Sequence, residues 1–418
     1  MNLSVIVIGD EILLGQVIDT NTSAIARTIG PAGWRVADVQ TVGDDADAIL
    51  TAIDRAFATS DAVITTGGLG PTKDDITKQT LIRRFGGELY ENAEVLENVE
   101  RLVARRKMKL NDLTRAQAMV PTSCRVIQNR VGTAPIMWFE TPEGKVLVTM
   151  PGVPFETETM LPEVFGLLQR RFPSPDHFAH ATLMVTDYTE SALAEHLASW
   201  EAALPPHLHL AYLPQPRLIR LRIDGTHTDQ AFIEAEVARA AEEIKALVGP
   251  ALLADSDVTP AENLLAEARR EGFTIATAES CTGGNIAHTL TLIPGASDVV
   301  AGGVVSYSND VKMRLLGVDP ATLDTLGAVS IPVVEQMARG ALAATGATLS
   351  MATSGIAGPG GGTPEKPVGM VCIAAAITRD GQTNVVSETA YFTGSRSRVI
   401  ASATTRALIL ATQLLRRP

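Results

Sequence analysis

Short apolar runs alternate with amphipathic stretches along the first part of the chain. The runs Leu3–Ile8, Val36–Val42 and Ala62–Thr66 are typical of β-strands, and the apolar spacing over Asn21–Gly30 and Ala46–Ala58 is helical. The order is therefore βαβαβ, which predicts a parallel sheet covered by helices on both faces. Ligands of such sheets gather beyond the carboxyl ends of the strands.

The pattern changes near residue 172, where a proline-rich stretch indicates a linker. After it we expect the strand Ala181–Val185, the helix Ser191–Trp200, the strand Leu218–Ile223 and the helix Asp229–Val248. The stretch between the helix Ser191–Trp200 and the strand Leu218–Ile223 is broken by prolines. These elements predict a small α+β domain.

A third segment opens with the helical pattern Pro260–Glu271 and closes with the amphipathic helix Arg396–Leu415. Between them lie five predicted strands: Phe273–Ala278, Val304–Tyr307, Leu349–Thr353, Val368–Ala376 and Val385–Phe392. We therefore predict an α/β fold in three domains, over residues 1–171, 172–250 and 251–418.

The composition is that of a globular protein, with 45% hydrophobic and 20% charged residues. A formal net charge of -12 repels a phosphate backbone and argues against direct nucleic-acid binding. The three cysteines are widely separated, which argues against disulfides and favours a reducing compartment. No apolar run is long enough for a membrane span, and a strand starting at residue 3 leaves no room for a signal peptide, so we expect a cytoplasmic protein.

Three turns rich in glycine and hydroxyl residues stand out in the third segment. They are Glu279–Gly284, then Gly295–Ser297 leading to Ser306–Asn309 and Lys312, and Ser354–Gly362. Turns of this kind expose backbone N–H groups that can hold an anion. Taken singly, each is more often an ordinary turn, with Ser280 only a helix N-cap and Lys312 only a solvated lysine. Three of them in one domain favour a ligand site.

The same turns contain no histidine, because His288 falls within a helical pattern. A serine activated by a desolvated, neutral lysine is therefore the natural candidate for attack on a carbonyl carbon. From the residues alone, Ser280 and Ser297 both stay open as the nucleophile, and Ser280 stands at the more suggestive turn.

From about residue 260 onward the chain resembles the C-terminal family of CinA proteins, the nicotinamide-mononucleotide amidohydrolases. The matching strings are Thr277–Gly284, Gly303–Asn309, Leu315–Val318, Gly327–Ser330 and Ser354–Gly369. The resemblance implies hydrolysis of the carboxamide of nicotinamide mononucleotide to nicotinic acid mononucleotide and ammonia, with no cofactor.

By this resemblance the nucleophile is Ser297, the base is Lys312, and Tyr307 orients the ring or the amide. Ser280 and Ser354 would supply supporting hydroxyls, the latter where the family often has threonine. The residues expected to bind substrate are Thr282, Gly283, Gly284, Gly355, Gly358, Gly360 and, on the phosphate side, Arg396.

The first segment contains a stretch, Gly67–Thr77, that joins a glycine turn to two carboxylates. The turn residues Gly67, Gly68 and Gly70 can receive phosphate oxygens, and Asp74 with Asp75 can hold a hard divalent ion. An equally weighted alternative is that both acids only cap the following helix. Further acids that could join a metal site end other predicted strands, namely Asp10, Glu11, Asp44 and Asp45.

Residues 1–170 resemble the molybdopterin-binding fold family, and specifically its CinA branch. The likeness is carried by Asn2–Asn21, Val42–Asp45, Thr65–Thr77, Val131–Pro135 and Met150–Pro154. Asp75 and Asp45 match acidic residues of the molybdopterin adenylyltransferases, whereas Asp74 stands where those enzymes often have a basic residue. The CinA branch implies hydrolysis of ADP-ribose to AMP and ribose 5-phosphate. A divalent ion of the magnesium or cobalt class would be held by Asp10, Asp45, Asp74 and Asp75.

The middle segment resembles the KH-type domain that lies between the two halves of CinA proteins. An RNA-binding KH domain needs a GxxG loop, which is missing here, and residues 176–250 hold 11 acidic against 5 basic residues. We therefore expect a structural unit or a dimer contact, with a homodimer implied by the family and no membrane partner. Two alternatives stay open: a non-catalytic adaptor for DNA-processing partners, and an N-terminal half that transfers adenylyl groups to molybdopterin.

Overall fold

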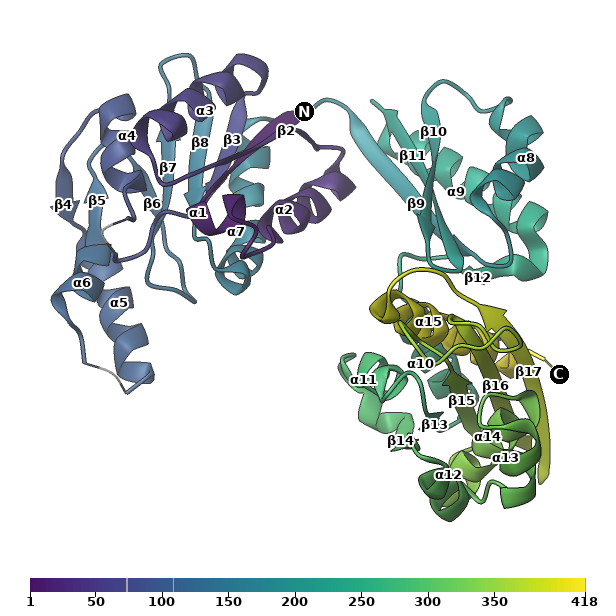
Figure 1. The fold of residues 1–418 in the computed structure, drawn as a ribbon. Helices are drawn as coiled ribbons and strands as arrows, with labels where there is room; N and C mark the ends of the chain where they lie inside the picture. The colour runs from purple at the N-terminus through teal and green to yellow at the C-terminus, as the bar shows by residue number, and fades with distance from the viewer. Residues whose placement is uncertain (73, 108, 418) are drawn as a thin grey trace. The chain divides into compact units, whose positions relative to one another are not determined.

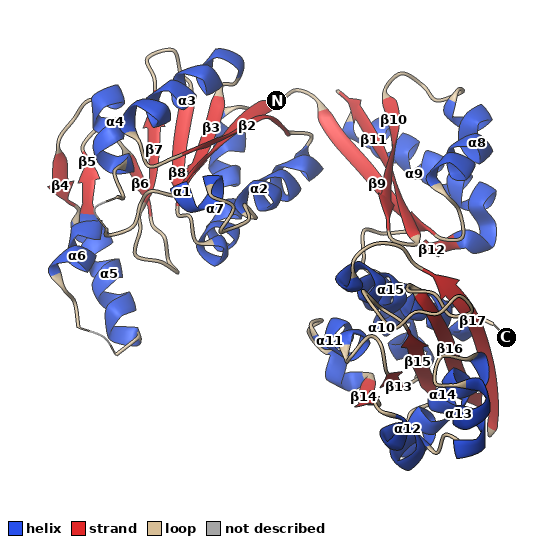
Figure 2. Cartoon of the chain, in the orientation of Figure 1, coloured by secondary structure: helices blue, strands red, loops and turns tan. Residues whose placement is uncertain are grey.

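The computed structural model describes residues 1–72, 74–107 and 109–417. Its contacts divide the chain into two compact units, Met1–Ala179 with Gly225–Glu234, and His180–Asp224 with Ala235–Pro418. Figure 1 follows the chain from the N- to the C-terminus, and Figure 2 shows that helices and strands alternate through all of its parts. The predicted α/β class is confirmed.

The first unit is built on a six-stranded sheet in the order β2-β1-β3-β8-β7-β6. These strands are β1 (Asn2–Ile8), β2 (Arg35–Val42), β3 (Ala62–Thr66), β6 (Arg125–Ile127), β7 (Ile136–Glu140) and β8 (Val146–Met150). The first three strands and β8 run parallel, and β7 and β6 add an antiparallel edge. The predicted parallel sheet is thus confirmed, with an antiparallel extension.

Helices cover both faces of this sheet (Figure 2). They are α1 (Asp10–Leu13), α2 (Asn21–Ile29), α3 (Ala46–Thr59), α4 (Thr77–Phe85), α5 (Ala93–Arg105), α6 (Asp112–Arg115) and α7 (Pro154–Arg171), beside a small pair of strands, β4 (Leu89–Glu91) and β5 (Met119–Pro121). Side chains of β1 alternate between the faces. Leu3 and Val5 pack with residues of α2 and α7, whereas Ile6 and Ile8 pack with residues of α3.

A four-stranded sheet follows, in the order β10-β11-β9-β12. Its elements are β9 (His177–Val185), α8 (Glu190–Glu201), β10 (Leu208–Gln215), β11 (Leu218–His227), α9 (Gln230–Val248) and β12 (Leu252–Ala254). The proline-broken stretch therefore contains a strand, β10, that the sequence pattern did not reveal. The last strand comes from beyond residue 250, inside the range predicted for the next domain. The likeness to a KH domain stays a prediction.

The C-terminal part has a five-stranded sheet in the order β14-β13-β15-β16-β17. Its strands are β13 (Ile275–Glu279), β14 (Val300–Val305), β15 (Leu349–Gly355), β16 (Met370–Arg379) and β17 (Gln382–Tyr391). Its helices are α10 (Pro260–Glu271), α11 (Asn285–Thr291), α12 (Asn309–Leu316), α13 (Pro320–Leu326), α14 (Ile331–Thr345) and α15 (Arg396–Leu415). Residues of α10, α11 and α15 pack on one face of this sheet, and residues of α13 and α14 pack on the other.

Three of these elements bear on the predictions. The helices Pro260–Glu271 and Arg396–Leu415 are confirmed to the residue. The bounds of the strand predicted at Val304–Tyr307 are wrong, because β14 begins at Val300 and ends at Val305. Within the described ranges, none of the helices combines the length and the apolar character that crossing a bilayer requires.

Candidate functional site

Three neighbouring parallel strands of the C-terminal sheet pair in register near their carboxyl ends. Glu279 at the end of β13 pairs with Val305 of β14 on one side and with Thr353 of β15 on the other. The residue that follows each of these three is a serine: Ser280, Ser306 and Ser354. The carboxyl edge of the sheet, where ligands of α/β folds gather, therefore carries a row of three hydroxyl groups.

Lys312 reaches this row from α12, a helix that begins after the N-cap residue Ser308. Its side chain is buried, with 1% of the residue exposed. The Nζ atom lies 3.1 Å from the Oγ of Ser280 and donates to the carbonyl oxygen of Ser306 at 2.7 Å. Burial lowers the pKa of Lys312, and the nearby Cys281 opposes this only in part. No carboxylate forms an ion pair with Lys312 in the described part of the chain.

Ser297 is not part of this arrangement. It is exposed and lies in the 3-10 turn Ala296–Asp298, before the first residue of β14, whereas Lys312 follows the last. The six residues of β14 span roughly 20 Å of extended chain between the two positions. The length of β14 therefore separates Ser297 from Lys312 within the chain, which does not fit the expected pairing, and the serine that contacts the lysine is Ser280.

Glu279 fixes the loop that carries Ser280, a role that the sequence reasoning missed. The side chain is fully buried. Its Oε2 accepts hydrogen bonds from the backbone N–H groups of Gly284 and Ile286 at 3.0 Å, and its Oε1 accepts one from Ala287 at 2.9 Å. The sequence signal for this role was a carboxylate between a buried strand and a glycine turn. The first N–H groups of the helix that follows such a turn need acceptors.

Tyr307, Gly358 and Arg396 come together although they lie on separate segments. Arg396 donates through Nη2 to the Tyr307 hydroxyl at 3.1 Å and through Nη1 to the carbonyl oxygen of Gly358 at 2.8 Å. The Tyr307 residue is 63% exposed. Since the residue before it, Ser306, accepts from Lys312, this group adjoins the Ser280–Lys312 site and presents a guanidinium and a phenol beside it.

Other expected site residues have structural partners. The hydroxyl of Thr282 bonds to that of Thr353 at 2.7 Å, and Ser354 donates to the carbonyl oxygen of Ala328 at 2.6 Å. A Cβ at Gly355 would lie 2.7 Å from the carbonyl oxygen of Met370, so that glycine serves the close approach of β16. The glycines with an open side are Gly283 and Gly360, and Gly284 has only one neighbour at 3.4 Å.

A neighbouring thiol can be set aside as the nucleophile. Cys281 follows Ser280 directly, but it is buried, and burial raises the pKa of its thiol to about 12. A thiol in that state is protonated at neutral pH and is a poor nucleophile.

A second candidate site is a cleft of about 470 Å³ at the carboxyl edge of the N-terminal sheet, hereafter the N-terminal cleft. The loop Gly67–Gly70 forms one wall, as expected for Gly67, Gly68 and Gly70. Gly67 has a φ of 102°, and a Cβ there would lie 2.0 Å from the carbonyl oxygen of Ile8, so only glycine fits.

Five carboxylates line this cleft: Glu11, Asp44, Asp74, Asp75 and Glu156. Burial raises the pKa of Asp44, the N–H of Asp10 opposes this by donating to it, and the carboxylates of Asp10, Glu11 and Asp74 raise it further. Such a group of hard oxygen donors suits a divalent cation.

Two of the acids expected to bind metal accept hydrogen bonds from backbone N–H groups, and one of them is a helix cap. Asp45 is the N-cap of α3 and accepts from the N–H groups of Asp47 and Ala48, so its neighbour Asp44 lines the cleft in its place. Both oxygens of Asp75 accept hydrogen bonds within the loop, from Gly70 and Thr72. Among the residues placed in the structure, no three His, Cys, Asp or Glu side chains are arranged to hold a metal ion by themselves.

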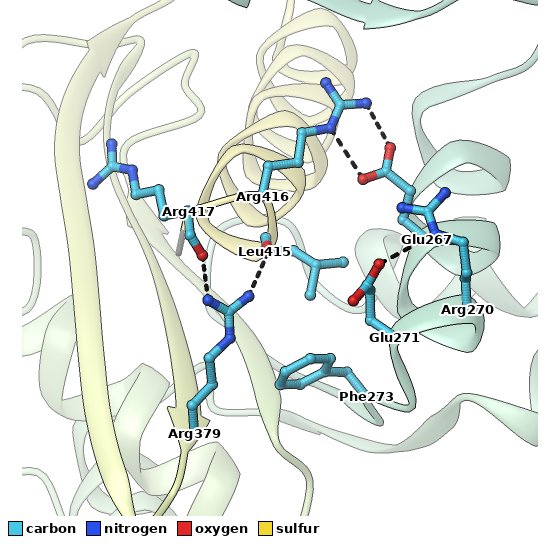
Figure 3. A pocket seen from close by; sticks show the side chains of 8 residues that line it. All are labelled: Glu267, Arg270, Glu271, Phe273, Arg379, Leu415, Arg416 and Arg417. Carbon is cyan, nitrogen blue, oxygen red and sulfur yellow. Dashed lines mark hydrogen bonds and ion pairs between the residues drawn. The ribbon is translucent and has the colours of Figure 1, made fainter.

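Another pocket, of about 440 Å³, lies at the end of α15 (Figure 3). It is rich in arginine, but most of these groups are engaged. Arg379 donates to the carbonyl oxygens of Leu415 and Arg417, and Arg416 pairs with Glu267 through two nitrogens. These contacts satisfy the last carbonyls of the helix and hold it to α10, which is a structural role.

Comparison with known proteins finds two family models, each on a separate part of the chain. Residues 257–415 match the family model described as "CinA C-terminal domain", and residues 4–170 match the one described as "Probable molybdopterin binding domain". A "CinA-like protein" of Cytophaga hutchinsonii is 42% identical over 89% of this chain and 89% of its own length. Another, of Geobacter sp., is 41% identical over 96% of this chain and 94% of its own length.

Solved structures of related proteins cover parts of the chain. The competence/damage inducible protein CihA of Agrobacterium tumefaciens is 43% identical, covers 36% of this chain and 89% of its own, and superimposes with a TM-score of 0.34. The molybdopterin biosynthesis enzyme MoaB of a Thermus species is 20% identical, covers 40% of this chain and 92% of its own, and has a TM-score of 0.28.

Proposed function

This chain belongs to the CinA family, and from that premise we propose that its C-terminal domain hydrolyses the carboxamide of nicotinamide mononucleotide to nicotinic acid mononucleotide and ammonia. The contact between Lys312 and Ser280 carries the proposal. A buried lysine without an acidic partner has a lowered pKa and can be neutral, and a neutral amine within hydrogen-bond distance of a hydroxyl can act as its base.

The reaction follows from that pair in two stages. Ser280 Oγ attacks the amide carbon while its proton passes to Lys312 Nζ; the C–N bond then breaks, and the same proton leaves with the amine as ammonia. Water next attacks the resulting ester, Lys312 takes its proton, and this proton returns to Ser280 as the carboxylic acid departs. Every proton is thus handled by one side chain.

The loop after β13 supports a binding site for the oxyanion of the tetrahedral intermediate. Five N–H groups of this loop and helix already have acceptors, those of Gly283, Gly284, Asn285, Ile286 and Ala287. The N–H groups of Cys281 and Thr282 take no part in these bonds. They follow the nucleophile directly, which is the position from which backbone donors stabilise a tetrahedral intermediate.

The test is ammonia release from nicotinamide mononucleotide by the full chain and three variants. Ser280→Ala and Lys312→Met should lose at least about 1,000-fold in kcat, because nucleophile and base act as one unit. Ser297→Ala is the matched control and should behave as the unchanged protein, since that serine is exposed at the far end of β14. If all four proteins are equally inert, the proposal fails and the adaptor alternative gains support.

For the N-terminal domain we propose a second function, metal-dependent hydrolysis of ADP-ribose to AMP and ribose 5-phosphate. The carboxylates that raise the pKa of Asp44 support it, since a cation would relieve their mutual repulsion. Asp10, Asp44 and Asp74 would hold the ion, and it would neutralise charge on the diphosphate. Because no three acids are arranged to bind it alone, the substrate oxygens would complete the ligand set.

Asp75 and the glycine loop would contribute in another way. By accepting from Gly70 and Thr72, Asp75 keeps the Gly67–Gly70 loop open along the cleft, where its backbone can approach a phosphate. Incubation with ADP-ribose and Mg²⁺ or Co²⁺ should yield AMP, and a chelator should stop it. If no AMP forms, but adenylylated molybdopterin appears when ATP and molybdopterin are supplied, the transferase alternative takes its place.

A further inference from the structure

The N-terminal cleft is lined in part by a buried polar side chain whose amide oxygen has no partner. Gln117 lies in the 3-10 turn Ala116–Ala118, lines the cleft, and is 2% exposed. Its Oε1 accepts no hydrogen bond from any residue that the structure describes. Buried polar atoms in folded proteins are nearly always paired, and an unpaired one that borders a binding cleft indicates a group that a ligand supplies.

The backbone beneath this amide is held in place. The carbonyl oxygen of Gln117 accepts from the Nζ of Lys78 at 2.8 Å, and Lys78 is itself largely buried at the start of α4. The turn therefore cannot easily move to give the amide oxygen a protein partner. The position of the Gln117 backbone beside the cleft is therefore fixed by the fold.

The cleft lining falls into two chemical kinds. The carboxylates and the glycine loop suit a phosphate group with a cation, as argued above. The rest of the lining is neutral apart from Glu156, whose pKa is raised by burial, and includes Gln117, Thr133, Ala134 and Val153. An uncharged heterocyclic ring fits this neutral part of the cleft, because the ring needs few polar contacts and water does not hydrate it there.

We propose that the Gln117 amide recognises the exocyclic amino group and the ring nitrogen N7 of an adenine base. This inference rests on the second proposed function, in which the substrate is ADP-ribose. A side-chain amide carries an acceptor and a donor side by side, which complements the amino group and ring nitrogen of adenine in two hydrogen bonds. Hypoxanthine and guanine place a carbonyl oxygen where adenine has the amino group, so Gln117 Oε1 would face another acceptor.

The test compares ADP-ribose with IDP-ribose, its hypoxanthine analogue, in the metal-loaded full-length protein. The unchanged protein should prefer ADP-ribose by roughly 10- to 100-fold in kcat/KM, the range that corresponds to one unmade hydrogen bond at a buried group. Gln117→Leu should lose this preference, mainly through a higher KM for ADP-ribose, and should treat IDP-ribose as before. Equal losses on both substrates, or no preference in the unchanged protein, would overturn the inference.

Gln128→Leu is the matched control. Gln128 also has a buried amide atom without a partner, its Nε2, but it does not line the cleft. This variant should keep the base preference, and thermal unfolding should show both variants folded. A preference lost equally in Gln128→Leu would show that the effect is structural and overturn the inference.

Binding without turnover separates this inference from the proposed hydrolysis. Calorimetric titration with AMP and IMP, in the absence of a metal ion, should show tighter binding of AMP that Gln117→Leu abolishes. If no AMP is formed from ADP-ribose but this binding difference is found, the hydrolysis proposal fails and base recognition stands. If ADP-ribose is hydrolysed and neither binding nor kcat/KM depends on Gln117, base recognition alone fails.

Discussion

The Nζ atom of Lys312 lies 3.1 Å from the Oγ of Ser280, although 32 residues separate the two in the chain. The contact exists because β13 and β14 run parallel and end in register, so that Ser280 and Ser306 follow adjacent strand ends. Helix α12 then begins three residues after Ser306 and turns its lysine back over this edge. Five predictions follow from this site and from the N-terminal cleft.

Deamidation should increase as the pH rises through the lowered pKa of Lys312, because only the neutral amine can take the proton of Ser280. Lys312→Arg should be inactive at every pH, at least about 1,000-fold below the unchanged protein, since a guanidinium stays charged. Initial rates of ammonia release against pH, for both proteins, provide the measurement. A rate that falls with rising pH over this range would contradict the assignment.

The same lysine should make stability depend on pH. Its pKa in the folded chain lies below the ordinary value of 10.5, so between the two values the unfolded chain binds more protons. The free energy of unfolding should therefore rise with pH across that window, and Lys312→Met should remove the rise. Urea unfolding at several pH values measures it. Lys245, whose pKa is raised by hydrogen bonds to Glu242 and Asp255, is the control, and Lys245→Met should change the slope in the opposite sense.

Replacing Glu279 should loosen the nucleophile loop. Glu279→Ala leaves three buried N–H groups without acceptors, and we expect a loss of about 2–4 kcal/mol in the free energy of unfolding. Glu279→Gln keeps one acceptor oxygen and should lose less. The exposed cap Glu262→Ala, which removes one hydrogen bond of a capping box, should cost only about 1 kcal/mol. Equal losses in Glu279→Ala and Glu262→Ala would argue against the role given to Glu279.

Arg396 should act on substrate binding and little on chemistry. If it binds the phosphate of nicotinamide mononucleotide, Arg396→Ala should raise KM by roughly 10- to 100-fold and leave kcat nearly unchanged. Nicotinamide riboside, which lacks the phosphate, should be deamidated equally by both proteins. If Arg396→Ala weakens deamidation of the riboside by the same factor, Arg396 acts only through its hydrogen bonds to Tyr307 and Gly358.

The adjacent acids Asp44 and Asp45 should have different roles. Asp44→Asn should raise the metal concentration needed for half-maximal ADP-ribose hydrolysis, by roughly 10-fold or more, because this carboxylate lines the cleft. Asp45→Ala should leave that concentration unchanged and lower the free energy of unfolding by about 1 kcal/mol, since it caps α3. Metal titrations of AMP formation, together with urea unfolding, distinguish the two. The reverse outcome would return Asp45 to the metal site.

Periodicity along the chain was enough to predict the α/β class, the parallel N-terminal sheet and the bounds of α10 and α15. These features depend on local spacing, two residues for a strand and 3.6 for a helix, which the sequence displays directly. The glycine loops and their hydroxyl neighbours were equally visible, because a turn after a buried strand needs particular residues at fixed positions.

Which of these residues meet was decided by the tertiary structure alone. The family resemblance paired Ser297 with Lys312, and the weak local signal of the glycine-containing strand Val300–Val305 did not reveal that a whole strand separates them. Likewise, nothing local distinguishes Asp44 from Asp45, or shows that Gln117 reaches a cleft. Such contacts are set by the hydrogen-bonded register of strands that are distant in sequence, and a pattern of a few residues carries no information about that register.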